Sequence, residues 1–471
     1  MQRTCRRLFT TTVKIPTTII PKTGKPVSRI GFGAYRVSTD EHGQALRDAL
    51  QAGVNVIDTG ANFENGIRLC RNGAGASEKV IGKTLQDLQV ERENLTLISK
   101  SGYLSSAEAA LFHEKEAVQI TDKSFHSLSP KVFEKQIAQS LDRLRTKKLD
   151  IFMINAPERM LTAKNKVYTL NHLYKDLETA FKYLDTLVSD GTIGGYGICS
   201  NSMALPTAVD HISLADVLKS CNQPSNFQAI QVPFNLYERE AVVPSGWDQS
   251  AQVKPVSQVA KENDIYVMTN RPLNTIANGQ IRTLVNHPIE VLASGAVQLE
   301  DELSTKFVWS QVLSENLARL SQNYFAARHY LSQQVLPAVE KDLEDLDVYA
   351  EEMDAEATKA AFVDWMTNYR EGMRELVDDV VSYAYVDVLR KNNELDRIMD
   401  ALCPSLGRDF ESAYSPLSAK TLRFLMANPN VDTVLTGMRQ PRYVKDALLA
   451  TQHLAVEKED LDDVWRCPLF N

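Results

Sequence analysis

The chain has 471 residues, of which 44% are hydrophobic and 24% charged, and its formal net charge is −8. Proteins that bind nucleic acids usually have a basic surface, so this charge argues against that class. No apolar stretch approaches the roughly 18 residues of a membrane-spanning helix, so we expect no membrane span. The length suggests two or three domains, unless the fold is a barrel, which can hold about 250 residues or more in one domain.

The N-terminal stretch, MQRTCRRLFTTTVK, differs in composition from the rest of the chain. It contains Arg3, Arg6, Arg7 and Lys14, several hydroxyl side chains and no acid. This composition is typical of a mitochondrial presequence; the alternative is an ordinary basic N-terminus. We expect residues 1–15 to be a presequence that is removed, which would place the mature protein in the mitochondrial matrix.

The cysteines are scattered along the chain. They form no Cys-x-x-Cys pair, and no histidine stands at metal-ligand spacing from them. This pattern favours a reduced compartment over a disulfide framework or a zinc site, so we expect no metal. The residues are Cys5, Cys70, Cys199, Cys221, Cys403 and Cys467.

Short apolar runs rich in β-formers recur, and each is followed by a helix-like stretch. Two of these stretches have clear ends. Ser129 and Pro130 stand at the N-cap and first position of a helix over 129–144, and Gly191 closes a helix over 173–191 as a C-cap would. The expected strands are 29–35, 54–60, 95–102, 149–155, 194–201, 227–235, 265–273 and 431–439.

Eight nearly continuous apolar strands that alternate with helices indicate a parallel sheet covered by those helices. Eight is also the number that closes a (β/α)₈ barrel, the TIM barrel, which is the α/β fold we predict. The alternative is a doubly wound open sheet. Such a sheet usually carries a Gly-x-Gly-x-x-Gly turn after its first strand, and GFGAYR lacks the third glycine.

One gap interrupts this alternation. More than 150 residues separate Leu273 from Val431, and the part from about 285 to 410 has helical periodicity and almost no glycine. Within it, the acidic stretch 341–356 is interpreted as a connector. We predict a helical subdomain, 276–410, inserted between strands seven and eight of a barrel formed by 16–275 and 411–471. At a βα-loop it would overhang the carboxyl-terminal face, as a lid or as a docking surface for a protein partner.

Polar side chains stand at or near the carboxyl ends of five of the predicted strands. A lysine that ends an apolar strand is costly unless it is paired, and Asp58 on the adjacent strand is the natural partner of Lys100. The alternative is an ion pair at the barrel rim without a catalytic role. The five residues are Asp58, Lys100, Asn155, Asn201 and Gln231.

Eight segments occur in the order in which they occur in one known family. The chain resembles the aldo-keto reductase superfamily over residues 17–275 and 413–451. The resemblance implies reduction of a small-molecule carbonyl by NADPH, or oxidation of an alcohol in reverse. The matching segments are RIGFGAYR, GVNVIDTGANF, SEKVIGKTL, LISKSGY, SLDRLRTKKLDIFMINAPE, DGTIGGYGICSNS, QVPFNLYE and VLTGMRQPRYV.

In that family an aspartate, a tyrosine, a lysine and a histidine carry the chemistry. The tyrosine protonates the carbonyl oxygen, the aspartate-paired lysine lowers the tyrosine's pKa, and the histidine orients the carbonyl. The resemblance assigns the aspartate to Asp58 and the lysine to Lys100. The tyrosine position holds Phe63 and the histidine position holds Asn155.

The substitutions at the tyrosine and histidine positions should affect catalysis to different degrees. Asparagine can still donate a hydrogen bond to a carbonyl, whereas phenylalanine has no proton to give. General acid catalysis contributes about 10²–10⁴-fold, so its loss should cripple ketone reduction unless another group substitutes. The candidate substitutes are Tyr35, Tyr103 and a water held by Lys100.

The resemblance also implies a set of cofactor-binding residues. Ser200 and Asn201 match the pair that binds the nicotinamide carboxamide, and Gln231 matches its companion. NADP(H) is favoured, although Tyr443 stands where many members have arginine or glutamine, and NAD(H) stays an alternative. A bidentate arginine for the pyrophosphate and the segment for the adenosine 2′-phosphate are matched by Arg271, Gly437 and Arg439.

Two functional hypotheses follow. The first is an NADP(H)-binding oxidoreductase of aldo-keto reductase type with weakened proton transfer. The second is a pseudoenzyme that serves as a structural or nucleotide-sensing part of a mitochondrial complex and docks through its insertion. The sequence leaves open whether the protein is an active enzyme.

Overall fold

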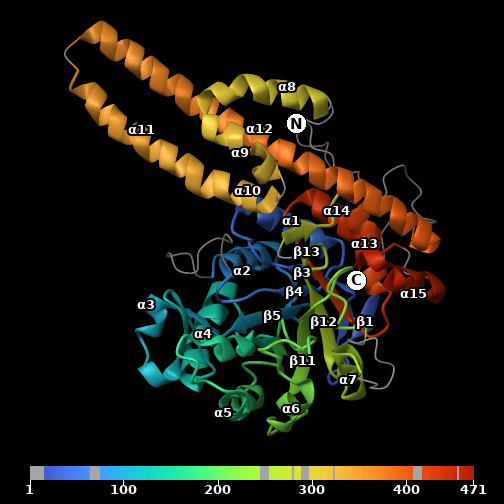
Figure 1. Cartoon of the computed structure of the whole chain (residues 1–471). Helices are drawn as coiled ribbons and strands as arrows, with labels where there is room; N and C mark the ends of the chain where they lie inside the picture. The colour runs from blue at the N-terminus through green and yellow to red at the C-terminus, as the bar shows by residue number, and fades with distance from the viewer. Residues whose placement is uncertain are drawn as a thin grey trace, which may run out of the picture. The chain divides into compact units, whose positions relative to one another are not determined.

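The computed structural model in Figure 1 describes residues 15–63, 75–243, 254–277, 280–287, 296–321, 324–353, 355–406, 416–452 and 456–470. The chain divides into two compact units, described separately below. The barrel unit is Met1–Leu273 with Ser405–Asn471, and the inserted unit is Asn274–Pro404. The predicted presequence lies outside the described residues, except for Ile15.

The barrel unit contains a closed barrel of eight parallel strands in chain order. The last strand pairs with the first, Val434 opposite Ile30, so the sheet has no free edge. The predicted (β/α)₈ fold is confirmed, and the doubly wound open sheet is wrong. The strands are β3 (Ile30–Gly33), β4 (Val56–Asp58), β5 (Thr96–Ser101), β9 (Ile151–Asn155), β10 (Tyr196–Cys199), β11 (Phe227–Pro233), β12 (Tyr266–Asn270) and β15 (Thr433–Thr436).

Each strand is shorter than the apolar run that predicted it. The run 54–60, for example, pairs only over Val56–Asp58, because the flanking residues belong to the connections on either side. Buried side chains from alternate positions of several strands, including Val56, Ile98, Ile151 and Met268, form one apolar cluster. Alternation along parallel strands places these residues on the same side of the sheet.

Helices follow most of the strands. Ser129 caps α4 (Pro130–Leu144), as its Oγ accepts a hydrogen bond from the Lys131 amide. The helix expected over 173–191 is α5 (Leu170–Ser189), whose C-cap is Asp190; Gly191 follows with a φ of +83°, which glycine adopts without strain. The others are α1 (Asp40–Gln51), α2 (Ala76–Leu88), α3 (Ser106–Ala109), α6 (Leu214–Lys219), α7 (Val256–Glu262), α13 (Leu417–Met426), α14 (Pro441–Ala450) and α15 (Lys458–Arg466).

Two small sheets in the barrel unit were not predicted. The hairpin β1 (Thr17–Ile19) and β2 (Pro26–Ser28) precedes the barrel. The sheet β6 (Tyr103–Ser105), β8 (Ser124–His126) and β7 (Val118–Thr121) lies in the connection that follows β5. Strands of three or four residues are too short to show an alternating pattern in the sequence. The second sheet matters for the site, because it contributes His126 and Tyr103.

The inserted unit follows the seventh barrel strand and precedes the eighth, as predicted. An unpredicted hairpin, β13 (Asn274–Ala277) with β14 (Gln280–Thr283), opens it. The helices after it are α8 (Ala296–Lys306), α9 (Gln311–Ser321), α10 (Tyr324–Tyr330), α11 (Leu336–Glu351) and the 47-residue α12 (Glu356–Leu402).

The helices of this unit pack around α12, with Leu303, Leu331, Met373 and Leu376 in one buried cluster. Helices α11 and α12 run antiparallel (Figure 1). The acidic stretch 341–356 was wrongly expected to be a connector, since most of it belongs to α11. Among the described helices of the whole chain, none is both long and apolar enough to cross a membrane.

Candidate active site

Asp58 and Lys100 form a buried ion pair at the carboxyl ends of β4 and β5. Lys100 Nζ donates to Asp58 Oδ1, and also to the Thr59 carbonyl over 3.2 Å. Lys100 is 1% exposed and Asp58 is 5% exposed. The neighbouring strands are in register, with Asp58 opposite Ile98, so both side chains reach the same layer of the barrel. The ion pair expected from the sequence is therefore present.

Gln231 of β11 links this pair to β10 and β12. Its Nε2 donates to Asp58 Oδ1 over 3.0 Å, and its Oε1 accepts from the Cys199 thiol at 3.2 Å and from Asn270 Nδ2 at 3.1 Å. Burial raises the pKa of Cys199 to about 12, although the Lys100 ammonium opposes that shift. Cys199 thus keeps its proton, and the network is a chain of fixed donors and acceptors around one buried carboxylate.

The phenyl ring of Phe63 lies beside the Lys100 ammonium. The Nζ atom is 5.0 Å from the ring centroid, within the range of a cation–π contact. The ring of Tyr35, which follows β3, meets Phe63 edge-on with centroids 5.3 Å apart. The aromatic group next to the lysine is therefore one without a hydroxyl, and a tyrosine lies directly behind it.

Asn155 ends β9, and its backbone is held by a histidine that the sequence reasoning missed. His126 Nε2 lies 2.7 Å from the Asn155 carbonyl oxygen, so this nitrogen carries the proton. His126 is fully buried, and burial lowers its pKa to about 4. Gly102 packs so closely that a Cβ there would lie 2.8 Å from Nε2. At neutral pH His126 is an uncharged positioning group.

The ring of Tyr103 packs against His126. The two rings meet edge-on with centroids 5.0 Å apart. Burial raises the pKa of Tyr103, with smaller effects from Arg159 and Glu158. A raised pKa makes this phenol a weaker acid than an exposed tyrosine.

Ser200 and Asn201 follow β10 and form a tight turn fixed by Glu158. The Ser200 hydroxyl accepts from the amides of Ser202 and Met203. Glu158 Oε1 accepts from the Asn201 amide over 2.8 Å and from Asn201 Nδ2 over 3.4 Å. Burial raises the pKa of the Glu158 carboxyl. Its Oε2 atom has no hydrogen-bond partner among the described residues.

Arg271 follows β12 and is held by an acid. Its Nη2 donates to Glu238 Oε1 over 2.6 Å, and Asn235 donates both to Glu238 and to the Arg271 carbonyl. Arg271 has a φ of +55°, a conformation that costs free energy for a residue with a side chain. Its Nε atom and Asn270 Oδ1 are buried without partners in the described part of the chain.

Gly437 and Arg439 lie between β15 and α14. Gly437 is exposed, and a Cβ added there would meet no atom within 4 Å. Arg439 is half-buried and lies near His42, whose pKa is lowered by burial and then by the Arg439 charge. Tyr443, in the first turn of α14, packs its ring against the Arg442 guanidinium. These residues stand at the same, carboxyl-terminal end of the barrel as the ion pair.

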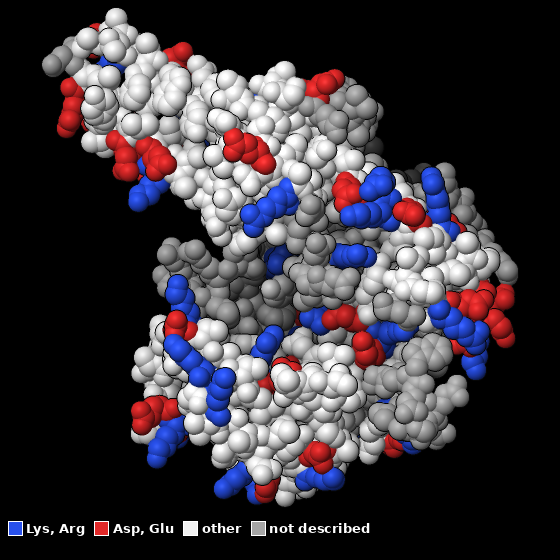
Figure 2. Space-filling view, viewed as in Figure 1, with Lys and Arg blue, Asp and Glu red and all other residues white. Residues whose placement is uncertain are grey.

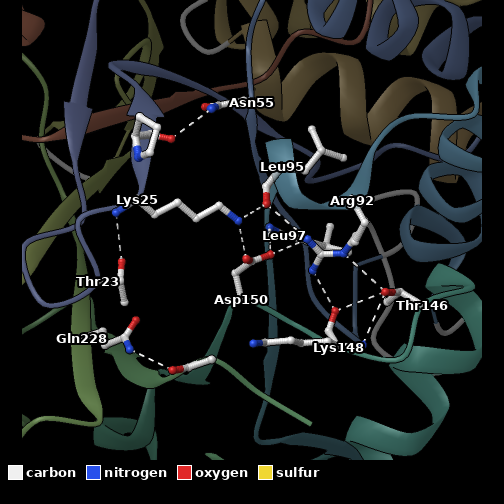
Figure 3. A network of polar contacts seen from close by, with 12 residues as sticks. Thr23, Lys25, Asn55, Arg92, Leu95, Leu97, Thr146, Lys148, Asp150 and Gln228 are labelled. Atoms are coloured by element: carbon white, nitrogen blue, oxygen red, sulfur yellow. Dashed lines mark hydrogen bonds and ion pairs between the residues drawn. The ribbon is translucent and has the colours of Figure 1, made fainter. Parts of the chain in front are cut away.

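The opposite end of the barrel holds a cavity of about 650 Å³, lined in part by Lys25, Asn55 and Leu95. Figure 3 shows the polar contacts beside it. Lys25 and Arg92 both pair with Asp150, over 2.6 Å each, and Asp150 Oδ2 also accepts from the Leu97 amide. None of the predicted site residues lines this cavity, and the Asp150 carboxylate shown in Figure 3 is paired with two cations. We interpret the network as a structural one that holds the connections together at the amino ends of the strands.

Comparisons with known proteins agree with this architecture. The model of the aldo/keto reductase family matches residues 29–291. A curated relative, aldo-keto reductase YhdN of Bacillus subtilis (strain 168), is 24% identical over 231 residues, which cover 47% of this chain and 55% of the relative. The chain thus spans about half the length of that relative.

Solved structures of aldo-keto reductases also align. The holo form of AKR11C1 from Bacillus halodurans aligns with 15% identity over 96% of each chain and a TM-score of 0.48. An aldo/keto reductase from Klebsiella pneumoniae in complex with NADP and acetate aligns with 12% identity, over 95% of this chain and 94% of its own, with a TM-score of 0.45. The family match extends over more than half of a chain that forms a closed eight-stranded barrel, and it shows that this protein belongs to the aldo/keto reductase family.

Proposed function

We propose that the barrel unit is an NADP(H)-binding oxidoreductase that acts on a carbonyl or alcohol substrate with a weakened proton-transfer apparatus. The observation that carries the proposal is the buried pair of Asp58 and Lys100. A fully buried ion pair is costly to desolvate, so a barrel that served only as a scaffold would gain by replacing it with apolar residues. Its presence at the carboxyl ends of the strands supports retained chemistry.

The residues present fit a dinucleotide. Asn270 Oδ1 and Arg271 Nε are buried polar atoms without partners in the described structure. The two residues are consecutive in the chain, and Asn270 donates a hydrogen bond to Gln231. The amide group of a nicotinamide could donate a hydrogen bond to Asn270 Oδ1, and a phosphate could accept one from Arg271 Nε. We propose Ser200, Asn201 and Gln231 for the nicotinamide, Arg271 for the pyrophosphate, and Gly437 with Arg439 for the adenosine phosphate.

When bound, the reduced cofactor supplies a hydride, and the protein must supply a proton to the carbonyl oxygen. Lys100, held by Asp58, provides the positive charge that stabilises an oxyanion. Asn155 can donate a hydrogen bond to the same oxygen. Phe63 cannot donate a proton. We propose three alternative proton sources: Tyr103, a water bound to Lys100, and Tyr35, whose ring packs on Phe63.

Titration of the purified protein with NADPH, followed by fluorescence, tests the cofactor proposal. We expect saturable binding at submillimolar concentration, weakened by Arg439→Ala. The same variant should bind NADH unchanged if Arg439 contacts the 2′-phosphate. Absence of binding of both NADPH and NADH in this range would exclude the oxidoreductase.

The proton-donor proposal is tested with Phe63→Tyr on panels of aldehydes and quinones. We expect turnover to rise by about 10²–10⁴-fold, the contribution of a positioned general acid. Phe63→Leu is the matched control, since it changes the ring without adding a hydroxyl. If Phe63→Tyr leaves the rate unchanged although NADPH binds, the native protein already has an efficient donor, or the tyrosine position has been misassigned.

The second candidate is a pseudoenzyme that serves as a structural or nucleotide-sensing component of a mitochondrial complex. The observation that favours it is the phenyl ring beside Lys100, together with an inserted unit that has its own core. A pull-down that compares the intact chain with one lacking Asn274–Pro404 tests docking through this unit. Recovery of the same partners with both chains would exclude that form of the alternative.

The proposed location is the mitochondrial matrix, on the basis of the basic, acid-free residues 1–15. Import into isolated mitochondria provides the test. We expect the full chain to reach the matrix and to be shortened near residue 15. A chain with Arg3, Arg6 and Arg7 changed to Glu should stay outside, and equal import of both chains would contradict the assignment.

A further inference from the structure

Four aromatic side chains of the inserted unit form a continuous series on its surface, here called the aromatic row: Tyr349 of α11 and Phe362, Trp365 and Tyr369 of α12. Tyr349 meets Phe362 edge-on with centroids 6.4 Å apart. Phe362 stacks on Trp365 at 5.9 Å, and Trp365 stacks on Tyr369 at 5.4 Å, with interplanar angles of 14° and 19°. The spacing 362, 365, 369 repeats every three or four residues, so the rings line one face of α12.

Only two of the four rings in the aromatic row pack against the core of the unit. Beneath it, Leu343, Ala350 and Met366 form the buried contact of α11 with α12, and Phe362 and Tyr369 pack partly against them. Tyr349 and Trp365, in contrast, remain 58% and 46% exposed. Val348, which precedes Tyr349, and Val363, which follows Phe362, are exposed as well. Exposed apolar residues that occur singly are ordinary, but an adjoining set with tryptophan and tyrosine marks an interaction surface.

The charge of the inserted unit indicates what this surface binds. Asn274–Pro404 contains 23 Asp and Glu against 11 Lys and Arg, a formal net charge of −12, so the remainder of the chain carries +4. Acidic side chains gather over α11 on the face shown in Figure 2. The exposed acids on the two helices that carry the aromatic row include Asp345, Asp347, Glu352 and Asp364.

Basic residues of these helices do not neutralise that charge. Arg370 and Arg374 both pair with Glu340, over 3.0 Å and 2.6 Å, and Arg370 also approaches Asp347 at 3.7 Å. Glu340 stands near the beginning of α11, and Asp347 stands two residues before Tyr349. Asp345, Glu352 and Asp364 are exposed and make no ion pair within the described part of the chain, so acids remain in excess near Tyr349 and Trp365. A ligand for this surface should therefore be cationic as well as apolar.

We propose that the aromatic row is the docking surface for a cationic amphipathic helix of a protein partner. The apolar face of such a helix would pack on Tyr349 and Trp365. Its arginine and lysine side chains would pair with the flanking acids and lie over the aromatic rings, which attract cations. An anionic membrane and a nucleic acid carry the wrong charge for this surface. The inference does not depend on whether the barrel unit reduces a carbonyl.

The test uses the full chain and three labelled model helices, with fluorescence anisotropy as the readout. One peptide has leucine on one face and arginine on the other; the second has glutamate in place of arginine; the third has serine in place of leucine. We expect only the leucine–arginine peptide to bind, with an affinity that falls as salt is added. Equal binding of the glutamate peptide, or no binding of the arginine peptide, would overturn the proposal.

Variants locate the surface. Trp365→Ala should weaken binding by about thirtyfold, the effect of losing one interface anchor. Trp365→Phe should restore most of it, which separates loss of contact from a folding defect. Asp345→Asn with Asp364→Asn should lower the affinity and flatten its salt dependence. Val312→Ala, at an exposed valine of α9 outside the aromatic row, is the matched control and should change nothing.

Two outcomes would show that the surface has another role. If Trp365→Ala binds the peptide as tightly as the native chain, the aromatic row is not the docking site. If the native chain self-associates in sedimentation and Trp365→Ala abolishes this, the occupant is a second copy and the proposed partner is wrong.

Discussion

The barrel unit and the inserted unit differ in where their charged side chains lie. In the barrel unit, Asp58 and Lys100 are almost completely buried, and Gln231, Cys199 and Asn270 complete a hydrogen-bonded network around them. In the inserted unit the buried cluster consists of apolar side chains such as Leu331, Met373 and Leu376, and the ion pairs are partly or fully exposed.

This difference shows where each unit can act. A buried ion pair has a large effect on its surroundings because little water screens it, which suits chemistry on a small molecule. Exposed charges are screened, and their individual contribution to stability is small. A surface with an excess of one sign is instead suited to attracting and orienting a partner. The two units thus support two separate kinds of function.

The largest effect is expected for Lys100→Met, which leaves the Asp58 carboxylate buried without its partner. We expect the barrel unit to lose roughly 3–5 kcal/mol of unfolding free energy. Hydrogen exchange followed by mass spectrometry reports each unit separately, and exchange in Asn274–Pro404 should not change. Lys131→Met, at an exposed pair with Glu116, is the matched control. An equal loss in both variants would mean that burial is not the cause.

A core substitution in the inserted unit should give the reverse pattern. Leu376→Ala removes a fully buried side chain of the apolar cluster and should cost about 2–5 kcal/mol. Hydrogen exchange should then increase in α12 and its neighbours, while β4 and β5 stay protected. Increased exchange in both units would show that they unfold together and would remove the basis for treating them separately.

Acid should weaken the barrel unit through His126. Its folded pKa of about 4 lies below the usual value of 6.5, so the unfolded chain binds a proton in this range and the native state does not. Stability present above pH 6.5 is therefore lost as the pH falls toward 4. Between pH 6.5 and pH 5 we expect a loss of about 2 kcal/mol, measured by denaturant unfolding. His126→Asn should lack this component; an unchanged pH dependence in that variant would assign it to other groups.

The smallest effect is expected for Lys391→Met in the inserted unit. Lys391 pairs with Asp387 over 2.6 Å on the surface of α12. Exposed pairs at this spacing contribute less than about 0.5 kcal/mol, and salt screens them. The substitution is the same as in Lys100→Met, so the ratio of the two losses in unfolding free energy measures how much burial contributes. Similar losses would contradict the contrast between the units.

The barrel and its ion pair could be predicted because each has a local signal in the sequence. Eight apolar runs separated by helical stretches leave few folds to consider. A lysine that ends a buried strand must find a carboxylate, and Asp58 was the acid on the adjacent strand. Both signals, an apolar run and a lysine at its end, can be recognised within a short segment of the sequence.

Other site residues acquire their role only through distant contacts. Glu158 follows a barrel strand, and its carboxylate accepts hydrogen bonds from Asn201, which lies 43 residues away. His126 belongs to a strand of three residues that pairs only after the chain has folded back. Neither residue lies in a periodic pattern, so no signal in the sequence singles it out.

The acidic stretch 341–356 was misinterpreted for a related reason. Its charge suggested a solvated connector, but Val339, Leu343, Leu346 and Ala350 recur at three and four residues and supply an apolar stripe for packing on α12. The described acids of this stretch lie outside that stripe and are exposed. Periodicity was a better guide here than net charge.

The closure of the barrel has a consequence for how the protein is made. Strand β15 fills the place between β12 and β3, yet about 160 residues of chain separate it from β12. During synthesis, seven strands emerge first and leave two unpaired edges until the last strand is available. Exposed edges of this kind invite pairing with other chains. The nascent protein should therefore depend on chaperones until the ribosome has passed the insertion, and early folding of the inserted unit would shorten the distance that the last strand must search.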